Sequence, residues 1–200
     1  MKKILRQIIS WSMVLALFAL LTGCGHNTQK AEQSVSEMLD GMKHAEITQI
    51  QQFFPEQLEQ EDATDADSKA LLQAMFKNLQ YTILSSEETA KDTIAVKTEI
   101  SNANLVEAFR MSVGEILNLS LENAFGNTLS DQEMSEKAFA VFISHIDSLT
   151  AEPVKTTVTI SVKKENGKWK PVADTAVADA ALGGLVTVFS QMEQAMGNAN

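Results

Sequence analysis

The chain has 200 residues, 44% of them apolar, and carries a net charge of −10 at pH 7. This length suits one domain with a real hydrophobic core, and the few prolines and glycines exclude a disordered or low-complexity chain. A single cysteine excludes an internal disulfide framework and a multi-cysteine zinc site. The acidic surface repels phosphate groups and anionic lipids, so we expect no nucleic-acid partner and no membrane attachment through surface charge.

The first 23 residues have the three-part layout of a secretion signal. A basic start, MKKILRQ, is followed by the uncharged stretch IISWSMVLALFALL. Its 14 residues are too few for a transmembrane helix, which needs about 20. We therefore expect residues 1–23 to be a signal peptide that is removed.

The end of this segment resembles the lipobox of bacterial lipoproteins. Leu21, Thr22 and Gly23 supply an aliphatic residue and two small residues directly before Cys24. The resemblance implies that the Cys24 thiol takes a diacylglycerol, that cleavage precedes Cys24, and that the protein is anchored to the cell membrane outside the cytoplasm. Two acyl chains give stable attachment. An uncleaved anchor with a coincidental cysteine is the alternative.

Residues 24–30 are expected to hold the lipidated cysteine and a short polar tether, and residues 31–200 a single α+β domain. From Cys24 onward the chain has 13 basic and 26 acidic side chains, a net charge of −13, because three basic residues precede that position. Gly25, the residue directly after Cys24, gives no sign that the protein is retained at an inner membrane, and we favour a Gram-positive cell surface.

The domain begins with helical spacing of apolar residues over 31–43 and 47–58. The acidic run 56–67 lacks the glycine and the closing glutamate of a calcium-binding loop, so it indicates a solvated loop. The next predicted helix buries Leu71, Leu72, Met75, Phe76 and Leu79.

Two stretches rich in Tyr, Thr, Ile and Val, QYTILSSEE and DTIAVKTEIS, predict a pair of strands. The polar run SSEETAKD, which overlaps the end of the first, is expected to form the hairpin loop. In the second stretch four alternate residues share one face, which predicts that they point into the core. They are Ile94, Val96, Thr98 and Ile100.

A later hairpin is predicted around Asn166-Gly167, the pair that most favours a type I′ turn. A two-residue turn pairs Lys164 with Trp169 and Val162 with Pro171, which places Trp169 on the apolar face of the first strand. The missing N–H of Pro171 predicts that its strand lies at an edge of the sheet.

Between the hairpins, residues 103–125 and 131–149 predict a helical pair, the second opened by a capping box at Ser130. The apolar stripe of the first is expected at Leu105, Phe109, Val113, Ile116, Leu119 or Ser120, and Ala124. His145 lies on the apolar side of the second and is expected to be a hydrogen-bonded core histidine.

The tail from Asp174 predicts a last helix, with a patch of small residues that suits the close approach of another backbone or, at its two glycines, a kink. The patch consists of Ala180, Ala181, Gly183 and Gly184.

This order predicts an α+β fold: a twisted antiparallel sheet of about four strands packed by helices, with N-terminal and C-terminal helices and a helical pair inserted between the two hairpins. The layout resembles cystatin-like and nuclear-transport-factor-like domains. The lipobox, the helical start and the strand pair VTISVKKENGKWKPV together resemble Gram-positive surface lipoproteins of uncharacterised function.

Several apolar residues are candidates to line a pocket for a small apolar ligand, and they are equally what an ordinary core needs. They are Met75, Phe76, Tyr81, Phe109, Phe142 and Trp169. The sequence has no helical histidine pair, no G-x-S-x-G elbow, no phosphate loop and no dinucleotide fingerprint, so we expect no catalytic residues, metal or cofactor.

The main functional hypothesis is a non-catalytic binding or interaction module at the cell surface, with a protein partner or a small apolar ligand. One alternative is a pocket enzyme of the isomerase or dehydratase type, because some enzymes of the resembled fold pair an Asp or His base with a tyrosine. Here those would be Tyr81 and Asp174, which no spacing argument brings together. The other alternative is a structural or assembly lipoprotein, homodimeric through the sheet or the small-residue patch.

Overall fold

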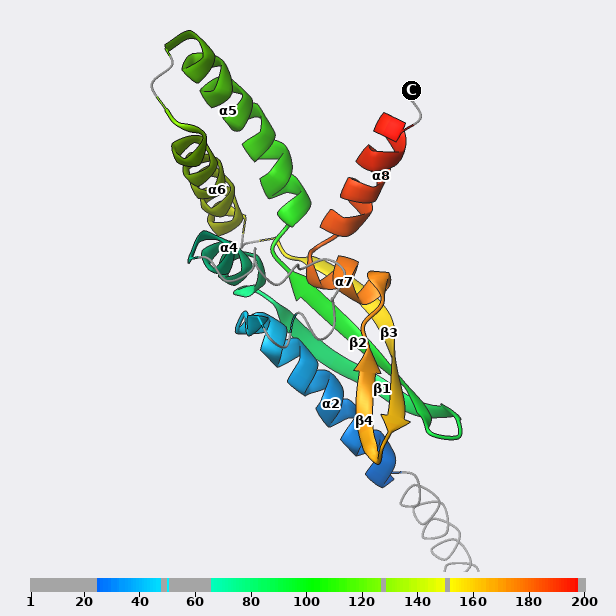
Figure 1. Cartoon of the computed structure of the whole chain (residues 1–200). Coiled ribbons are helices and arrows are strands. Elements are labelled where there is room, and N and C mark those ends of the chain that lie inside the picture. Colours follow the sequence, from blue (N-terminus) through cyan, green and yellow to red (C-terminus); the bar gives the residue numbers. More distant parts are fainter. Residues whose placement is uncertain (1–24, 48–49, 51–65, 127–128, 150–151, 198–200) are drawn as a thin grey trace, which may run out of the picture.

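A computed structural model describes residues 25–47, 50, 66–126, 129–149 and 152–197, and it shows an α+β fold (Figure 1). In chain order the elements are α2 (Gly25–Lys43), α4 (Ala66–Phe76), β1 (Gln80–Ala90), β2 (Thr93–Asn102), α5 (Leu105–Gly126), α6 (Asp131–Ser148), β3 (Val154–Glu165), β4 (Lys168–Val172), α7 (Thr175–Ala181) and α8 (Leu185–Gly197). The signal segment with Cys24, most of the predicted helix 47–58 and most of the acidic run 56–67 lie outside the described residues.

The four strands form one antiparallel sheet in the order β1-β2-β3-β4. Helices α2 and α7 cover one of its faces, and the other face carries exposed polar side chains such as Lys97 and Thr157. Side chains alternate between the two faces of a strand, so every second residue of β2 and β3 enters the core. The predicted inward row of β2 is confirmed, and it packs with Val158, Ile160 and Val162 of β3.

The β3–β4 hairpin has the predicted register, since Val162 pairs with Pro171 and Lys164 with Trp169. Asn166 and Gly167 have φ angles of 51° and 81°, as a type I′ turn requires. Strand β4 lies at the edge of the sheet, where the missing N–H of Pro171 costs no ladder bond.

The β1–β2 hairpin corrects the prediction of a long polar loop. Strand β1 continues to Ala90, and only two residues, Lys91 and Asp92, connect it to β2. The polar run is part of the strand because its backbone still pairs with β2, while most of its side chains face solvent. Ser86, on the inner face, donates to the Glu32 carboxylate of α2, so a polar side chain is tolerated there.

Helix α2 begins at Gly25, earlier than the predicted start at residue 31. Its first six residues are exposed or partly exposed, and Ala31 is the first buried residue. The expected boundary between tether and domain therefore falls inside one continuous helix. Whether residues 24–30 act as a tether stays a prediction.

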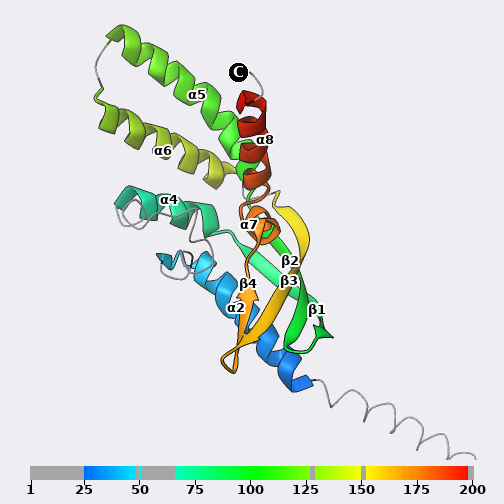
Figure 2. The same cartoon turned by 45° about the vertical axis from the view of Figure 1, so that its right-hand side comes forward.

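The helical pair is inserted between the hairpins as predicted, and it projects beyond the end of the sheet together with α8 (Figures 1 and 2). A second, smaller core holds its base, formed by Ala74, Ala103, Leu105, Ala108, Ile146 and Leu185. Farther along α5 the predicted stripe is not buried: Val113 is 47% exposed and Ala124 is also exposed. The reason is that the outer turns extend past the sheet that would have covered them.

The tail is not one helix, and the alternative of a kink at the two glycines is confirmed. The helix axis bends by 115° between α7 and α8. Gly183 and Gly184 have φ angles of 57° and 91°, which glycine adopts without strain. The small-residue patch packs against other parts of the same chain, because Ala180, Ala181 and Gly183 are buried.

Candidate functional site

The six candidate pocket residues divide between the two cores. Phe76, Tyr81 and Trp169 pack in the sheet core, whereas Phe109 and Phe142 pack in the smaller core. Met75 contacts both clusters. The six are therefore divided between two packing clusters that share Met75, and a pocket lined by all of them stays a prediction.

The Tyr81 and Asp174 pair is not brought together. Tyr81 lies on β1 and Asp174 follows β4, and these strands are opposite edges of the sheet, about 14 Å apart at the usual strand spacing. The Tyr81 hydroxyl is 3.5 Å from the Ser36 carbonyl oxygen of α2, and burial raises the pKa of this phenol. Asp174 caps α7 by accepting from the Val177 N–H at 3.0 Å. Each side chain has a structural contact of its own.

His145 joins the two helices of the inserted pair. Its Nε2 lies 3.0 Å from Oε2 of Glu115 on α5, and its side chain is 18% exposed. It is thus hydrogen-bonded, as predicted, but at a helix–helix contact near the surface and not in the core. Within the described residues no group of three His, Cys, Asp or Glu side chains is placed to hold a metal ion.

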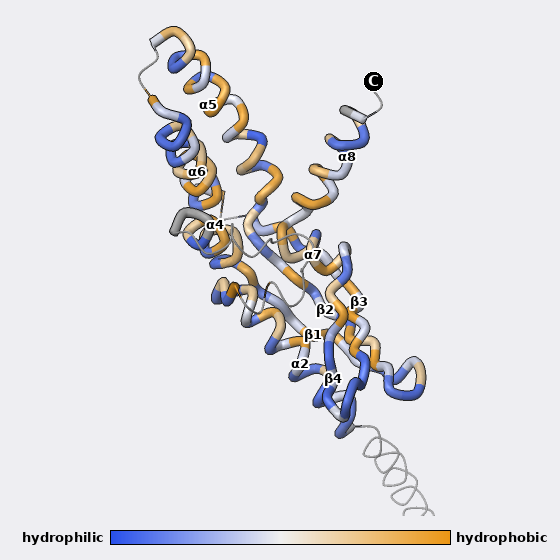
Figure 3. Tube along the Cα trace, viewed as in Figure 1, coloured by the Kyte–Doolittle hydropathy of each residue, from blue (hydrophilic) through white to orange (hydrophobic). Residues whose placement is uncertain are grey.

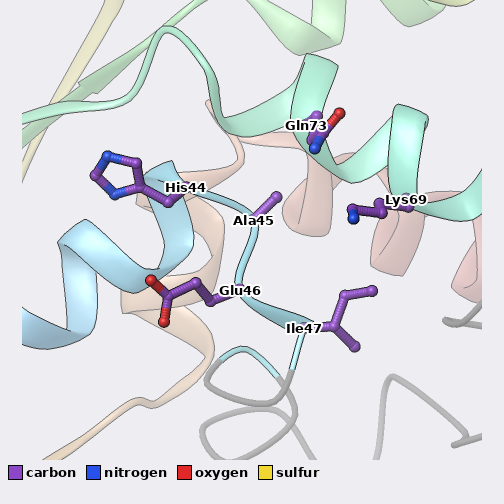
Figure 4. A pocket seen from close by; sticks show the side chains of 6 residues that line it. All are labelled: His44, Ala45, Glu46, Ile47, Lys69 and Gln73. Atoms are coloured by element: carbon purple, nitrogen blue, oxygen red, sulfur yellow. The ribbon is translucent and has the colours of Figure 1, made fainter.

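An open depression of about 370 Å³ lies between the end of α2 and α4 (Figure 4). Its lining residues are His44, Ala45, Glu46, Ile47, Lys69 and Gln73. The His44 and Glu46 side chains lie on the α2 side and do not converge with Lys69 and Gln73 across from them. None of the predicted pocket residues lines it. No sequence pattern predicted that its six lining residues would lie together.

The most distinctive surface lies on the projecting helices. Four residues of α5 recur at intervals of four, so each lies beside the next, and the row winds by about 120° around the helix at 3.6 residues per turn. Val113, Leu117, Leu121 and Phe125 are 47%, 58%, 50% and 91% exposed. On α8, Phe189 and Met192 are 41% and 43% exposed. We call these six residues the distal apolar face, and Figure 3 shows apolar residues recurring along α5 to its tip.

The two helices of this face meet only at their bases. The Phe109 ring packs edge-on against Phe189 of α8, with 5.0 Å between ring centres, and edge-on against Phe142 of α6 at 6.5 Å. Val106, one turn earlier on α5, lies against the Gly184 turn. Val113 and Leu117 follow Val106 by seven and eleven residues, so they lie on the same side of α5, the side from which α8 departs.

The distal apolar face lies at the opposite end of the molecule from the start of α2 (Figures 1 and 2). Gly25, the first residue of α2, directly follows Cys24 in the sequence. An anchor on Cys24 would thus attach the protein by the end farthest from this face.

No described helix is by itself long and apolar enough to cross a membrane; only the sharply bent α7–α8 pair reaches the required length and composition when its two parts are taken together.

No protein-family model matches the sequence, and no curated protein matches it at a significant level. Among solved structures the chain is similar to one described as a "putative lipoprotein (ycdA)" from Bacillus subtilis, with 14% identity and a TM-score of 0.44. The match covers 75% of this chain and 45% of that one, so the chain spans less than half of the neighbour's length. A similarity of this size assigns neither fold nor function.

Proposed function

We propose that the protein is a lipid-anchored lipoprotein of the cell surface that acts as a non-catalytic binding module. The lipobox ending at Cys24 is the observation that carries the anchor. The binding role is supported by the exposed apolar side chains of the distal apolar face at the far end of the molecule, because exposed apolar patches on soluble proteins often mark interaction sites.

A protein partner fits this role better than a small apolar ligand. The residues that would have lined a ligand pocket are divided between two cores, whereas the distal apolar face is exposed along a helix. The pocket-enzyme alternative has less support, since Tyr81 and Asp174 lie at opposite edges of the sheet. A structural role through dimerisation of the small-residue patch is also disfavoured, because three of its four residues are buried within the chain.

Replacing Cys24 with alanine is expected to abolish lipid attachment, because no other side chain offers a thiol. Full-length protein should be produced in a Gram-positive host, and its intact mass measured from the membrane fraction. The expected wild-type mass is that of a chain beginning at Cys24 plus a diacylglycerol. Cys24→Ala should keep the mass of the unprocessed chain. A wild-type protein that retains residues 1–23 without added lipid would refute the anchor.

A further inference from the structure

The distal apolar face is held in place before any partner binds. At its base Leu105 and Ala108 of α5 and Leu185 of α8 are buried in the smaller core. The contacts of Phe109 fix α5 against both neighbouring helices, and the hydrogen bond between Glu115 and His145 fixes α5 against α6. A preorganised surface of this kind loses little entropy on binding.

The dimensions of the face suit a helix. Its α5 residues span positions 113 to 125, or about 18 Å at 1.5 Å per residue. This length matches four to five anchor positions of an amphipathic helix, which buries one apolar side in such a surface. Phe189 and Met192 of α8 are exposed as well, and Phe189 packs against Phe109 at the base of α5.

The charges around the distal apolar face indicate which kind of partner helix it would bind. Helices α5, α6 and α8 together carry eight acidic side chains and two basic ones. Of the two, Arg110 is already engaged by Glu107, with Nε donating to Oε2 at 2.8 Å. Glu122 and Glu193 lie on the two helices that form the face itself. An apolar strip within an acidic surface is complementary to a helix whose own apolar strip is flanked by lysine or arginine.

We propose that the distal apolar face binds a basic amphipathic helix of a protein partner, a proposal that rests on the binding role above for its setting outside the cytoplasm. A second copy of the chain is a poorer occupant, because it would bring the same acidic side chains together. An anionic membrane surface is also repelled, and the anchor would hold it at the other end of the molecule.

The test uses the mature chain, residues 24–200, with Cys24→Ser to keep it in solution. All buried residues described lie at Ala31 or beyond, so this substitution leaves the described core intact. The probe is a fluorescent 18-residue helix of leucine and lysine arranged amphipathically, and binding is followed by anisotropy. The control peptides are the same pattern with glutamate in place of lysine, and a leucine–lysine peptide scrambled to remove the apolar side.

The basic amphipathic peptide is expected to bind at least tenfold more tightly than either control. The double variant Leu117→Ser/Leu121→Ser should weaken that binding at least tenfold. Leu84→Ser is the matched control, since Leu84 is also 50% exposed but lies on β1, away from this face, and it should bind as the parent does. Added salt should weaken the binding, because part of it comes from unlike charges.

Equal binding of all three peptides, or an equal loss in the Leu84→Ser variant, would overturn the proposal. Sedimentation that shows a dimer lost on Leu117→Ser/Leu121→Ser would assign the face to a second copy instead. Flotation with phosphatidylglycerol vesicles that depends on the same two leucines would assign it to lipid. Because the assay uses unacylated protein, its failure would leave the Cys24 mass result untouched, and failure of acylation would leave the peptide result standing.

Discussion

Replacing Asn102 with alanine is expected to lower the free energy of unfolding by about 3–4 kcal/mol, because it leaves three backbone groups without their partner, two of them in buried hydrogen bonds and one in a partly buried one. The Asn102 side chain is fully buried at the end of β2. Its Nδ2 donates to the Met75 carbonyl at 2.8 Å and to the Ala181 carbonyl at 2.7 Å, and its Oδ1 accepts from the Ala103 N–H at 2.7 Å. One side chain thus ties β2 to α4 and α7, where the two cores meet.

Urea unfolding of the mature chain, followed by the fluorescence of Trp169, measures this loss. Trp169 is the only tryptophan after the signal segment, and it packs in the sheet core. Asn118→Ala is the matched control, because Asn118 is exposed on α5 and should change stability by less than about 1 kcal/mol. A loss below 1 kcal/mol for Asn102→Ala would show that these hydrogen bonds do not hold the elements together.

Replacing Gly183 with alanine is expected to cost about 2–4 kcal/mol, since two penalties add at this site. The backbone has a φ of 57°, and an added Cβ would lie 2.7 Å from the Ala103 carbonyl oxygen. A backbone oxygen cannot rotate away as a flexible side chain can, so the α7–α8 turn must shift. The change should also weaken peptide binding to the distal apolar face, because this turn sets the direction of α8.

Two other glycines separate the cost of the positive φ angle from the cost of the close approach to Ala103. Gly167 has a φ of 81° with nothing within 4 Å of an added Cβ, so Gly167→Ala should cost only about 1 kcal/mol. Gly114 lies in α5 with open space around it, so Gly114→Ala should stabilise the protein by up to about 1 kcal/mol. The same unfolding experiment compares all three variants. If Gly183→Ala were no more destabilising than Gly167→Ala, the close approach to Ala103 would carry no energetic weight.

The sheet was predictable because its signals are local. Alternating apolar residues in β2 and the Asn166-Gly167 turn fix both face and register, and the edge position of β4 follows from Pro171. The extent of β1 was missed because strand pairing is made by the backbone. A run of Ser, Glu and Thr can continue a ladder whenever its side chains reach solvent or, as with Ser86, a polar partner.

The candidate site was harder to predict, for a physical reason. Helical periodicity shows that Val113 belongs to an apolar stripe, but burial depends on where the sheet ends. Leu117 and Leu121 lie outside the stripe that the periodicity predicts, and they are exposed where α5 projects beyond the sheet. Asn102 gave no signal either, because a lone polar residue after a strand is usual in a turn.

The lipid anchor proposed at Cys24 would present the distal apolar face outside the cell and away from the membrane. Cys24 is the only native cysteine, and acylation would consume its thiol. A cysteine introduced elsewhere would then carry the only free thiol, and its labelling rate would depend on its own surroundings. Leu117→Cys and, near the anchor, Asn27→Cys place that thiol at exposed positions at the two ends of the molecule.

Intact cells of a Gram-positive host producing each variant are treated with a bulky, membrane-impermeant maleimide, and the membrane fraction is examined. Leu117→Cys should be labelled without lysis, and faster than Asn27→Cys, which the bilayer shields. Labelling of Leu117→Cys only after lysis, or slower labelling there than at Asn27→Cys, would contradict this orientation.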